Sequence, residues 1–371
     1  MVDEQPQARA GMRMIVTGGG TGGHLFPGIA VAEGMLARFS EAEVLFVSTG
    51  RALDNQALAN RPFGTASIAC KPLKGKSLLG RLTSLAQLPG SLWQALCLMR
   101  RFRPRLVLGV GGYVTGPVVL AAKMLGIATC IHEQNSVPGM ANRMLGKIVD
   151  RIYISIPGSE RFFPAGKTVL TGNPVRQELL AAGREQTFLG NGSTLLVLGG
   201  SQGAHRVNTL VVEALRQGAL PAGLRVIHQT GVTDEEAVRR AYAEAGIKAQ
   251  VSAFIGDMAD AYGQADLVIS RAGATTLAEL TVMGRPAIFI PYPYAADDHQ
   301  TTNARYLTAG GAARMFQERE LDAERLREEI LGLLHDPAQL REMAGRMRTF
   351  AHPGATEAIV EENARLLGLA A

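Results

Sequence analysis

The sequence has few residues that can cross-link the chain and no long uninterrupted hydrophobic run. Its three cysteines, Cys70, Cys97 and Cys130, are widely spaced among 371 residues and form no metal or redox motif, which favours a reducing compartment. The longest apolar candidate, 114–131, is broken by a lysine, glycines and a proline, and is therefore not expected to span a membrane. Residues 1–12 are polar and lack the apolar core of a signal peptide, so we expect a disordered tail. These absences predict a soluble protein.

The length and the distribution of charge indicate two domains. A chain of 371 residues is too long for one typical hydrophobic core, and 47% apolar content with 43 glycines is typical of α/β architecture. Residues 1–170 contain 19 basic and 9 acidic residues, a net charge of +10, whereas residues 171–371 contain 19 basic and 24 acidic residues, a net charge of −5. The basic half is therefore expected to meet an anionic partner.

Residues 265–303 predict a strand, a helix and a second strand. Two apolar, β-branched runs, 267–270 and 287–291, are bounded by turn residues. Between them, apolar side chains recur at three-residue steps, as they do on one face of a helix. These side chains are Leu277, Leu280 and Met283. The pattern is that of a βαβ unit.

The start of this helix has the features of a nucleotide-phosphate site. Residues 273–276 are small or polar, and the free N–H groups of a first helical turn favour a phosphate. Glu279 follows within about one turn, in reach of an attached ribose, and residues 297–300 add a polar cluster after the second strand. The alternative is an ordinary helix start, because small polar residues cap helices and a glutamate suits the helix dipole.

Glycine-rich turns follow three further predicted strands. The strands 14–17, 106–110 and 194–198 lead into GGGTGGH, GGYVTGP and GGSQGAH, and this rhythm favours a doubly wound parallel sheet with ligands at the strand ends. The first and third heptads share glycine at three positions and a final histidine, which suggests two similar Rossmann-like halves. Two of these turns lie in the basic half, where a second phosphorylated ligand is expected.

Domain boundaries follow from the same pattern. Turn residues replace periodic sequence near 157–175, where we expect a hinge. We expect one domain over 13–172, joined by a C-terminal helix at 355–371. A second domain, with the predicted nucleotide-phosphate site, is expected over 173–354.

Several polar residues near the predicted strand ends are candidates for chemistry. His24 opens the first helix and can take a proton from an attacking hydroxyl, although capping of its own helix is an equal alternative. His205 occupies the equivalent place in the second half, where we expect a structural or phosphate-adjacent role. Glu133, after His132, ends another strand and is the second candidate for a general base.

Two further candidates can bind a sugar diphosphate. Asn135 can offer an amide to a sugar, and Arg176 at the hinge can reach a diphosphate. For an isolated arginine, a surface salt bridge is the simpler alternative.

Residues 71–105 combine positive charge with leucines and Trp93, and they include no acidic residue. The basic residues are Lys71, Lys74, Lys76, Arg81, Arg100, Arg101, Arg103 and Arg105. This composition favours contact with an anionic membrane surface, and the alternative is a core helix with solvated ends. Nucleic acid is not the expected partner, because no binding motif or aromatic platform accompanies the charge.

Eight motifs in this order carry a resemblance to a known family. They are GGGTGGH, GVGGYVTGP, HEQN, TGNPVR, GGSQGAH, FIGDM, RAGATTLAEL and DDHQTTN. The chain resembles, from about Arg13 to its end, the peptidoglycan N-acetylglucosaminyltransferases of bacterial cell-wall synthesis. The resemblance implies a GT-B fold, with two Rossmann-like domains and the active site between them. It implies that residues 13–172, with the helix at 355–371, form the acceptor and membrane-associating domain and that residues 173–354 form the UDP-sugar donor-binding domain. It also implies an inverting transfer of N-acetylglucosamine from its UDP conjugate to the C4 hydroxyl of a lipid-linked muramoyl-pentapeptide, at the cytoplasmic face of the membrane.

The resemblance also implies which residues contact the donor substrate. They are Thr21, Gly22, Gly23, Asn135, Arg176, Ser201, Ile255, Ala274, Thr275, Thr276, Leu277, Ala278, Glu279 and Gln300. The Ile255 backbone would read the uracil, Glu279 the ribose and Gln300 the sugar hydroxyls. His205 departs from the family, where arginine is common, and the loop 292–298 is given no role.

Metal is not required to neutralise the leaving diphosphate. The helix dipole, backbone N–H groups and Arg176 can do so, and no Asp-x-Asp motif occurs, so we expect neither metal nor cofactor. Two alternatives share the nucleotide-binding features. A nucleotide-sugar epimerase needs no membrane face, and a non-catalytic nucleotide-sugar sensor needs no glycine turns in the basic half.

Overall fold

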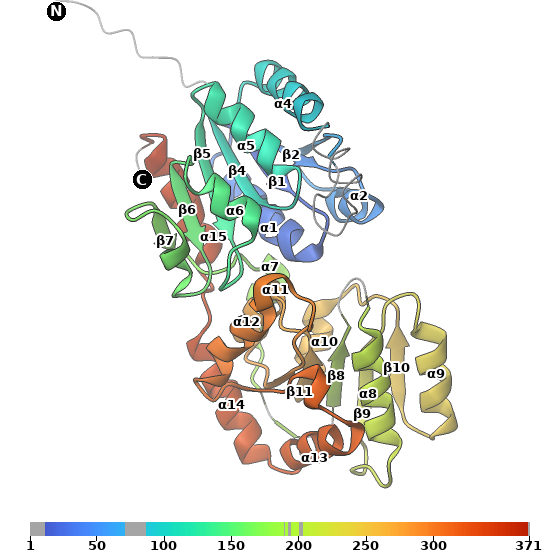
Figure 1. Ribbon diagram of the computed structural model, residues 1–371. Helices are drawn as coiled ribbons and strands as arrows, with labels where there is room; N and C mark the ends of the chain where they lie inside the picture. Colours follow the sequence, from blue (N-terminus) through green and yellow to red (C-terminus); the bar gives the residue numbers. More distant parts are fainter. Residues whose placement is uncertain (1–11, 71–86, 189, 192–193, 200–202, 370–371) are drawn as a thin grey trace, which may run out of the picture. The chain divides into compact units, whose positions relative to one another are not determined.

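The computed structural model describes residues 12–70, 87–188, 190–191, 194–199 and 203–369 (Figure 1). The chain divides into two compact units. The first contains Met1–Glu133, Pro138–Pro174 and Gly354–Ala371, and the second contains Gln134–Val137 and Val175–Pro353.

The described part of the first unit is built on a parallel sheet with the strand order β3-β2-β1-β4-β5-β6-β7. Its strands are β1 (Arg13–Gly18), β2 (Glu43–Ser48), β3 (Gly64–Ser67), β4 (Leu106–Gly111), β5 (Ala128–Glu133), β6 (Arg151–Ile154) and β7 (Thr168–Leu170). Its helices are α1 (Gly22–Arg38), α2 (Ala52–Leu58), α4 (Leu88–Phe102), α5 (Thr115–Met124), α6 (Met140–Leu145), the 3₁₀ turn η1 (Ser159–Phe162) and α15 (Ala355–Leu366). The central strands are buried on both faces, which explains their continuous apolar runs.

The alternation of side chains along β1 sends its residues into two separate cores. Met14 and Val16 pack in one core with α1 and the C-terminal helix α15. Ile15 points to the opposite core, which α4 and α5 complete. Helix α15 is also fixed by a hydrogen bond of 2.7 Å from the Tyr153 hydroxyl to Asn363 Oδ1.

The second unit repeats this architecture with the strand order β10-β9-β8-β11-β12-β13. Its strands are β8 (Thr194–Leu198), β9 (Arg225–Gln229), β10 (Ala249–Ser252), β11 (Leu267–Ser270), β12 (Ala287–Phe289) and β13 (Ala313–Met315). Its helices are α7 (Gln177–Glu185), α8 (His205–Arg216), α9 (Glu235–Glu244), α10 (Met258–Gln264), α11 (Ala274–Met283), α12 (His299–Thr308), α13 (Ala323–Leu334) and α14 (Pro337–Thr349), with the 3₁₀ turns η2 (Ala296–Asp298) and η3 (Glu318–Glu320).

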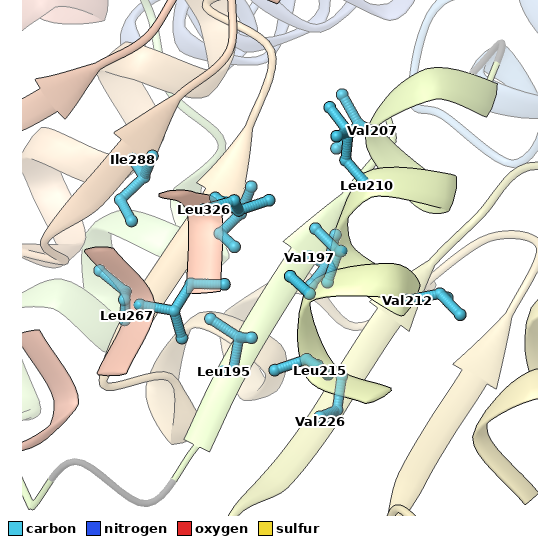
Figure 2. Packing of buried hydrophobic residues seen from close by; sticks show 14 of the residues in the cluster. Leu195, Val197, Val207, Leu210, Val212, Leu215, Val226, Leu267, Ile288 and Leu326 are labelled. Atoms are coloured by element: carbon cyan, nitrogen blue, oxygen red, sulfur yellow. The ribbon is translucent and has the colours of Figure 1, made fainter. Parts of the chain in front are cut away.

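One of the two cores of the second unit surrounds the central strand β8. Figure 2 shows Leu195 and Val197 of β8 packed with side chains of α8, among them Leu210, and with Leu326 of α13. All strand pairs in both described sheets are parallel. The doubly wound α/β class predicted from the sequence is therefore confirmed in each unit.

Each sheet reverses its direction of winding beside one central strand. In the first unit β1 lies between β2 and β4, and in the second β8 lies between β9 and β11. In sheets of this kind, ligands bind at the carboxyl ends of the strands at this switch point. The turns after β1, β4, β8 and β11 therefore frame the candidate sites.

Candidate active site

A buried carboxylate holds the first glycine turn, which follows β1. Gly19 and Gly20 adopt positive φ angles of 140° and 87°, which glycine tolerates without strain. Asp54 of α2 accepts a hydrogen bond of 3.0 Å from the Gly20 N–H through Oδ1 and one of 2.9 Å from the Thr49 hydroxyl through Oδ2. This turn is therefore fixed by the protein itself, and the Gly20 N–H is already engaged.

The turn after β4 packs directly on the first turn. A Cβ atom on Gly111 would lie 2.6 Å from His24 Nδ1, and one on Gly112 would lie 2.6 Å from the carbonyl oxygen of Gly19. Only glycine allows these two close approaches. His24, on the first turn of α1, is partly exposed. The fold thus brings the two glycine turns of the first unit and His24 together.

The residues that end β5 are buried. His132 Nε2 lies 3.2 Å from the Gly172 carbonyl oxygen and 3.0 Å from Ser155 Oγ. Burial lowers the pKa of His132 to about 4, so its imidazole is neutral near pH 7. The Glu133 carboxylate accepts a hydrogen bond of 2.8 Å from the Asn142 amide and is also 1% exposed. This hydrogen bond ties the end of β5 to α6.

Asn135 belongs to the short segment that groups with the second unit, and Asn303 of α12 holds it there. Asn303 Oδ1 accepts hydrogen bonds of 2.9 and 2.8 Å from the N–H and hydroxyl of Ser136. Its amide nitrogen donates to Asn135 Oδ1 and to the Ala272 carbonyl oxygen, both at 3.1 Å. These four hydrogen bonds use the full capacity of the buried amide. Asn303 thus joins Asn135 to the turn after β11.

The turn after β11 leads into α11, whose first residues are the predicted phosphate site. Thr275, Thr276 and Ala278 are partly exposed, whereas Ala274 and Leu277 are buried. Ala274 can offer a ligand only its backbone, and the Leu277 N–H already donates to the Gly273 carbonyl oxygen at 3.0 Å. The rest of the turn is fixed from the strand side. Arg271, the first residue after β11, donates through Nη1 to the carbonyl oxygens of Ile290 and Pro291 at 3.1 and 3.2 Å.

Glu279 is buried within α11 between two hydrogen-bond donors. Arg176 Nη2 lies 3.1 Å from Oε1, and the Tyr262 hydroxyl donates to Oε2 at 3.0 Å. Burial raises the pKa of Glu279, and the Arg176 charge and the two hydrogen bonds oppose this shift. The sequence predicted Arg176 and Glu279 separately, and the fold pairs them. The surface salt bridge considered for Arg176 is instead largely buried.

The remaining predicted contacts lie on loops and helix starts of the second unit. Ile255 lies between β10 and α10 and packs partly against the core. Gln300, on the first turn of α12, accepts a hydrogen bond of 2.9 Å from the Tyr292 N–H through Oε1. Ser201 lies outside the described residues.

His205 at the start of α8 is the outermost member of a polar network. Its Nδ1 lies 3.0 Å from Asp234 Oδ1, and Asn208 donates to Asp234 Oδ2 at 2.7 Å. Deeper in the core, Asn208 Oδ1 and the Tyr242 hydroxyl lie 3.1 and 2.9 Å from the two ring nitrogens of His228. Burial lowers the pKa of His228 to about 3, so it stays neutral. This network joins the start of α8 to Asp234, which precedes α9.

The basic segment 71–105 is described only from residue 87 onward, so Lys71, Lys74, Lys76 and Arg81 lie outside the described residues. Its described part forms α4, which buries Ala95 and Met99 in the core. Trp93, on another side of this helix, is 67% exposed. Within the described ranges, no helix has the length and apolar character needed to cross a membrane.

Asp54, Tyr262 and Asn303 were not singled out by sequence reasoning. Asn303 stood inside a recognised motif, DDHQTTN, which was the one available signal for it. Asp54 and Tyr262 lie in segments with ordinary composition, and their partners are 34 and 17 residues away. Their contacts become visible only in the folded chain.

Two Rossmann-type units with glycine turns at the switch points define the architecture of GT-B glycosyltransferases. The family models "Glycosyltransferase family 28 N-terminal domain" and "Glycosyltransferase family 28 C-terminal domain" match residues 14–154 and 194–359. The chain belongs to glycosyltransferase family 28.

A curated relative and a crystal structure narrow this assignment. One relative is the UDP-N-acetylglucosamine–N-acetylmuramyl-(pentapeptide) pyrophosphoryl-undecaprenol N-acetylglucosamine transferase of Desulfotalea psychrophila. The chain is 49% identical to it over 351 residues, and the match covers 94% of this chain and 95% of that protein. The crystal structure of Acinetobacter baumannii MurG has a TM-score of 0.74 and 33% identity, and the match covers 95% of this chain and 99% of that one.

The fold is shared more widely than the sequence. A UDP-GlcNAc 2-epimerase from Neisseria meningitidis, bound to UDP-GlcNAc, has a TM-score of 0.68 with 15% identity, covering 95% of this chain and all of that chain. This second likeness concerns the fold alone.

Proposed function

We propose that this chain transfers N-acetylglucosamine from UDP-N-acetylglucosamine to the C4 hydroxyl of undecaprenyl-diphospho-muramoylpentapeptide, converting lipid I to lipid II in peptidoglycan synthesis. The observation that carries the proposal is the 49% identity to a transferase named for this reaction, over 94% of the chain. The arrangement around α11 supports it, because that helix start can hold a nucleoside diphosphate.

The second unit is the proposed donor site. The first N–H groups of α11, from Ala274 through Thr276, and the Arg176 guanidinium would bind the diphosphate. Glu279 would accept hydrogen bonds from the ribose, the Ile255 backbone would read the uracil, and Gln300 would contact the sugar. The remaining proposed substrate contacts are Thr21, Gly22, Gly23, Asn135, Ser201, Leu277 and Ala278.

In the proposed reaction the acceptor hydroxyl attacks the anomeric carbon of the donor sugar from the face opposite the diphosphate. The bond to the diphosphate breaks, UDP leaves with its electron pair, and the configuration at the anomeric carbon inverts. The α11 helix start and Arg176 stabilise the negative charge that develops on the leaving group. A metal ion is not needed for this step, because the fixed dipoles and the guanidinium supply the positive potential.

His24 is the proposed general base, ahead of Glu133. Its ring packs against Gly111 in a partly exposed position at the start of α1. Glu133 is almost fully buried, and its carboxylate already accepts hydrogen bonds from Asn142 and the Gly139 N–H. A base must come within hydrogen-bond distance of the hydroxyl proton, and His24 meets this requirement with less rearrangement.

The first unit is the proposed membrane-binding part, and the proposed location of the protein is peripheral, at the cytoplasmic face of the inner membrane. Neighbouring helices α4, α5 and α6 expose large apolar side chains, which we call the apolar helix surface. Its members include Trp93, Met124, Met140 and Met144, which are 67%, 60%, 63% and 65% exposed. Exposed arginines follow at the end of α4. Apolar side chains beside positive charge are typical of contact with an anionic bilayer.

The proposed function is tested by incubating the purified full-length chain with UDP-N-acetylglucosamine and a lipid I analogue. We expect one disaccharide product for each UDP released, and no UDP release when the acceptor is omitted. Binding of UDP without any disaccharide would contradict a transferase and favour a sensor. Conversion of the donor to its 2-epimer without acceptor would instead identify an epimerase.

A further inference from the structure

The hydroxyl of Tyr262 is directed at the carboxylate of Glu279 inside the second unit. Tyr262 lies in α10 and is 1% exposed, and its hydroxyl donates to Glu279 Oε2 at 3.0 Å. Burial raises the pKa of Tyr262 well above its usual value, so the phenol stays protonated and remains a donor. A fixed, neutral donor thus faces a carboxylate that is only 6% exposed.

The two partners of Glu279 divide its carboxylate between them. Arg176 lies at Oε1 and Tyr262 at Oε2, so both oxygens are held and the plane of the carboxylate is fixed. Each carboxylate oxygen has two acceptor positions, so one hydrogen bond to each oxygen leaves room for another. The pair of neighbouring hydroxyls on a ribose requires two acceptor positions with a defined orientation.

We propose that Tyr262 is a positioning residue that sets the selectivity of the donor site for a ribonucleotide over a deoxyribonucleotide. This inference rests on the proposed function in one respect, since it takes Glu279 as the group that binds the ribose hydroxyls. Tyr262 acts through Glu279 by holding Oε2 in place. Without the phenol, the carboxylate keeps only the Arg176 contact and rotates toward it.

The inference is tested with two single variants, Tyr262→Phe and Glu279→Gln. Their affinities for UDP and for UDP analogues that lack the 2′ or the 3′ hydroxyl are measured by titration calorimetry. We expect Tyr262→Phe to weaken UDP binding roughly 5- to 20-fold, less than the loss of Glu279 itself, because the ribose contact remains in a less fixed geometry. Binding of the analogue that lacks the contacted hydroxyl should change little, so the preference for UDP shrinks by the same factor.

A matched control separates this role from general stability. Tyr242 is also fully buried in the second unit, and its hydroxyl lies 2.9 Å from His228 Nδ1. Tyr242→Phe therefore removes an equivalent buried hydroxyl without touching Glu279. We expect it to leave the preference for UDP over the deoxy analogues unchanged.

The double variant Tyr262→Phe/Glu279→Ala provides a second, independent test, because alanine leaves no oxygen that can accept the Tyr262 hydroxyl. If Tyr262 acts only through the Glu279 carboxylate, removing its hydroxyl from Glu279→Ala causes no further loss of UDP affinity. A Tyr262→Phe variant that weakens UDP and both analogues equally, or that keeps the wild-type preference, overturns the inference.

The result for Glu279→Gln distinguishes a failure of the proposed ribose role of Glu279 from a failure of the proposed role of Tyr262. If Glu279→Gln keeps the wild-type preference for UDP, the ribose role of Glu279 is wrong and the Tyr262 role falls with it. If Glu279→Gln removes the preference and Tyr262→Phe does not, the donor site stands and only the inference about Tyr262 is wrong.

Discussion

Each unit has an equivalent pair of strands at its switch point, β1 and β4 in the first and β8 and β11 in the second, but the turns that follow these strands differ. After β4 in the first unit, Gly111 and Gly112 pack against His24 and Gly19, so this turn is filled by the chain itself. After β11 in the second unit, α11 begins with small, partly exposed residues and carries a buried ion pair one turn later.

This difference is what the two proposed tasks, acceptor binding and donor binding, require of one topology. A turn filled by its own chain presents a side chain such as His24, whereas an accessible helix start presents N–H groups and a positive dipole end. The first arrangement suits an acceptor hydroxyl, and the second suits a nucleoside diphosphate. The fold supplies the two positions, and the residues at the strand ends decide their use.

The largest expected effect comes from the histidines that end the two equivalent heptads. His24→Ala should lower kcat by roughly 10²- to 10⁴-fold, the usual contribution of a general base, while UDP affinity changes little. His205→Ala, at the equivalent place in the second unit, should lower kcat less than tenfold, because His205 is mostly exposed and is paired with Asp234. Steady-state kinetics with a soluble acceptor measures both variants. Equal losses would mean that the two heptads do not differ in function.

The next largest effect concerns the buried Arg176–Glu279 ion pair of α11. Glu279→Ala should weaken UDP binding by about 1.5–3 kcal/mol through loss of charge-assisted hydrogen bonds to the ribose. Calorimetry with a folded variant measures this change. An unchanged affinity would remove Glu279 from the donor site.

The same residue should make UDP binding sensitive to acid. Because burial raises the pKa of Glu279, its carboxyl takes up a proton at a pH above the ordinary value of 4.5. UDP affinity should therefore be highest at pH values above this raised pKa. It should fall as the pH drops through the pKa, because a protonated carboxyl loses acceptor capacity. Glu279→Gln should lack this component of the pH dependence, which gives a direct control.

The opposite charges of the two halves predict a third difference. Arg100 and Arg101 are exposed at the end of α4, next to the apolar helix surface. Each is worth about 1 kcal/mol near an anionic bilayer, so changing both to serine should reduce vesicle binding roughly 30-fold at low salt. Added salt should narrow the difference by screening the attraction.

A control with the same change of charge is available in the second unit. Arg240 and Arg319 are also exposed, and changing both to serine should leave vesicle binding nearly unchanged. If both double variants lose binding equally, net charge alone drives the interaction, and the apolar helix surface has no special part in it.

Much of the fold was predictable because it rests on patterns that the sequence repeats. The apolar runs that became β1, β4, β8 and β11 each lead into a turn, and their central residues are buried. The run 287–291 was expected to be one strand, but β12 ends at Phe289. Pro291 has no N–H to donate, and its carbonyl oxygen accepts from Arg271 instead of a neighbouring strand.

The contacts that shape the site were less predictable. Asn303 meets Ser136 at a separation of 167 residues, and Asp54 meets Gly20 at a separation of 34. A single hydrogen bond between distant residues leaves no periodic trace in a sequence, unlike a buried helix face or strand. Only the folded chain shows that Glu279 has Tyr262 as a partner as well as Arg176.

The smallest expected effect tests how the first glycine turn is held. Asp54→Asn keeps an oxygen that can accept the Gly20 N–H but removes the charge, so its cost should be about 1 kcal/mol. Asp54→Ala removes both hydrogen bonds of the carboxylate and should cost more. Because the turn leads directly into the helix that carries His24, both changes should lower turnover, and Asp54→Ala should lower it more than Asp54→Asn. UDP affinity should stay within about twofold, since Arg176, Glu279 and α11 belong to the second unit.

Kinetics with a soluble acceptor and calorimetry with UDP separate the two effects. A loss of UDP affinity that follows the loss of turnover would show that this turn serves the donor, and the division of tasks between the two units would then be wrong.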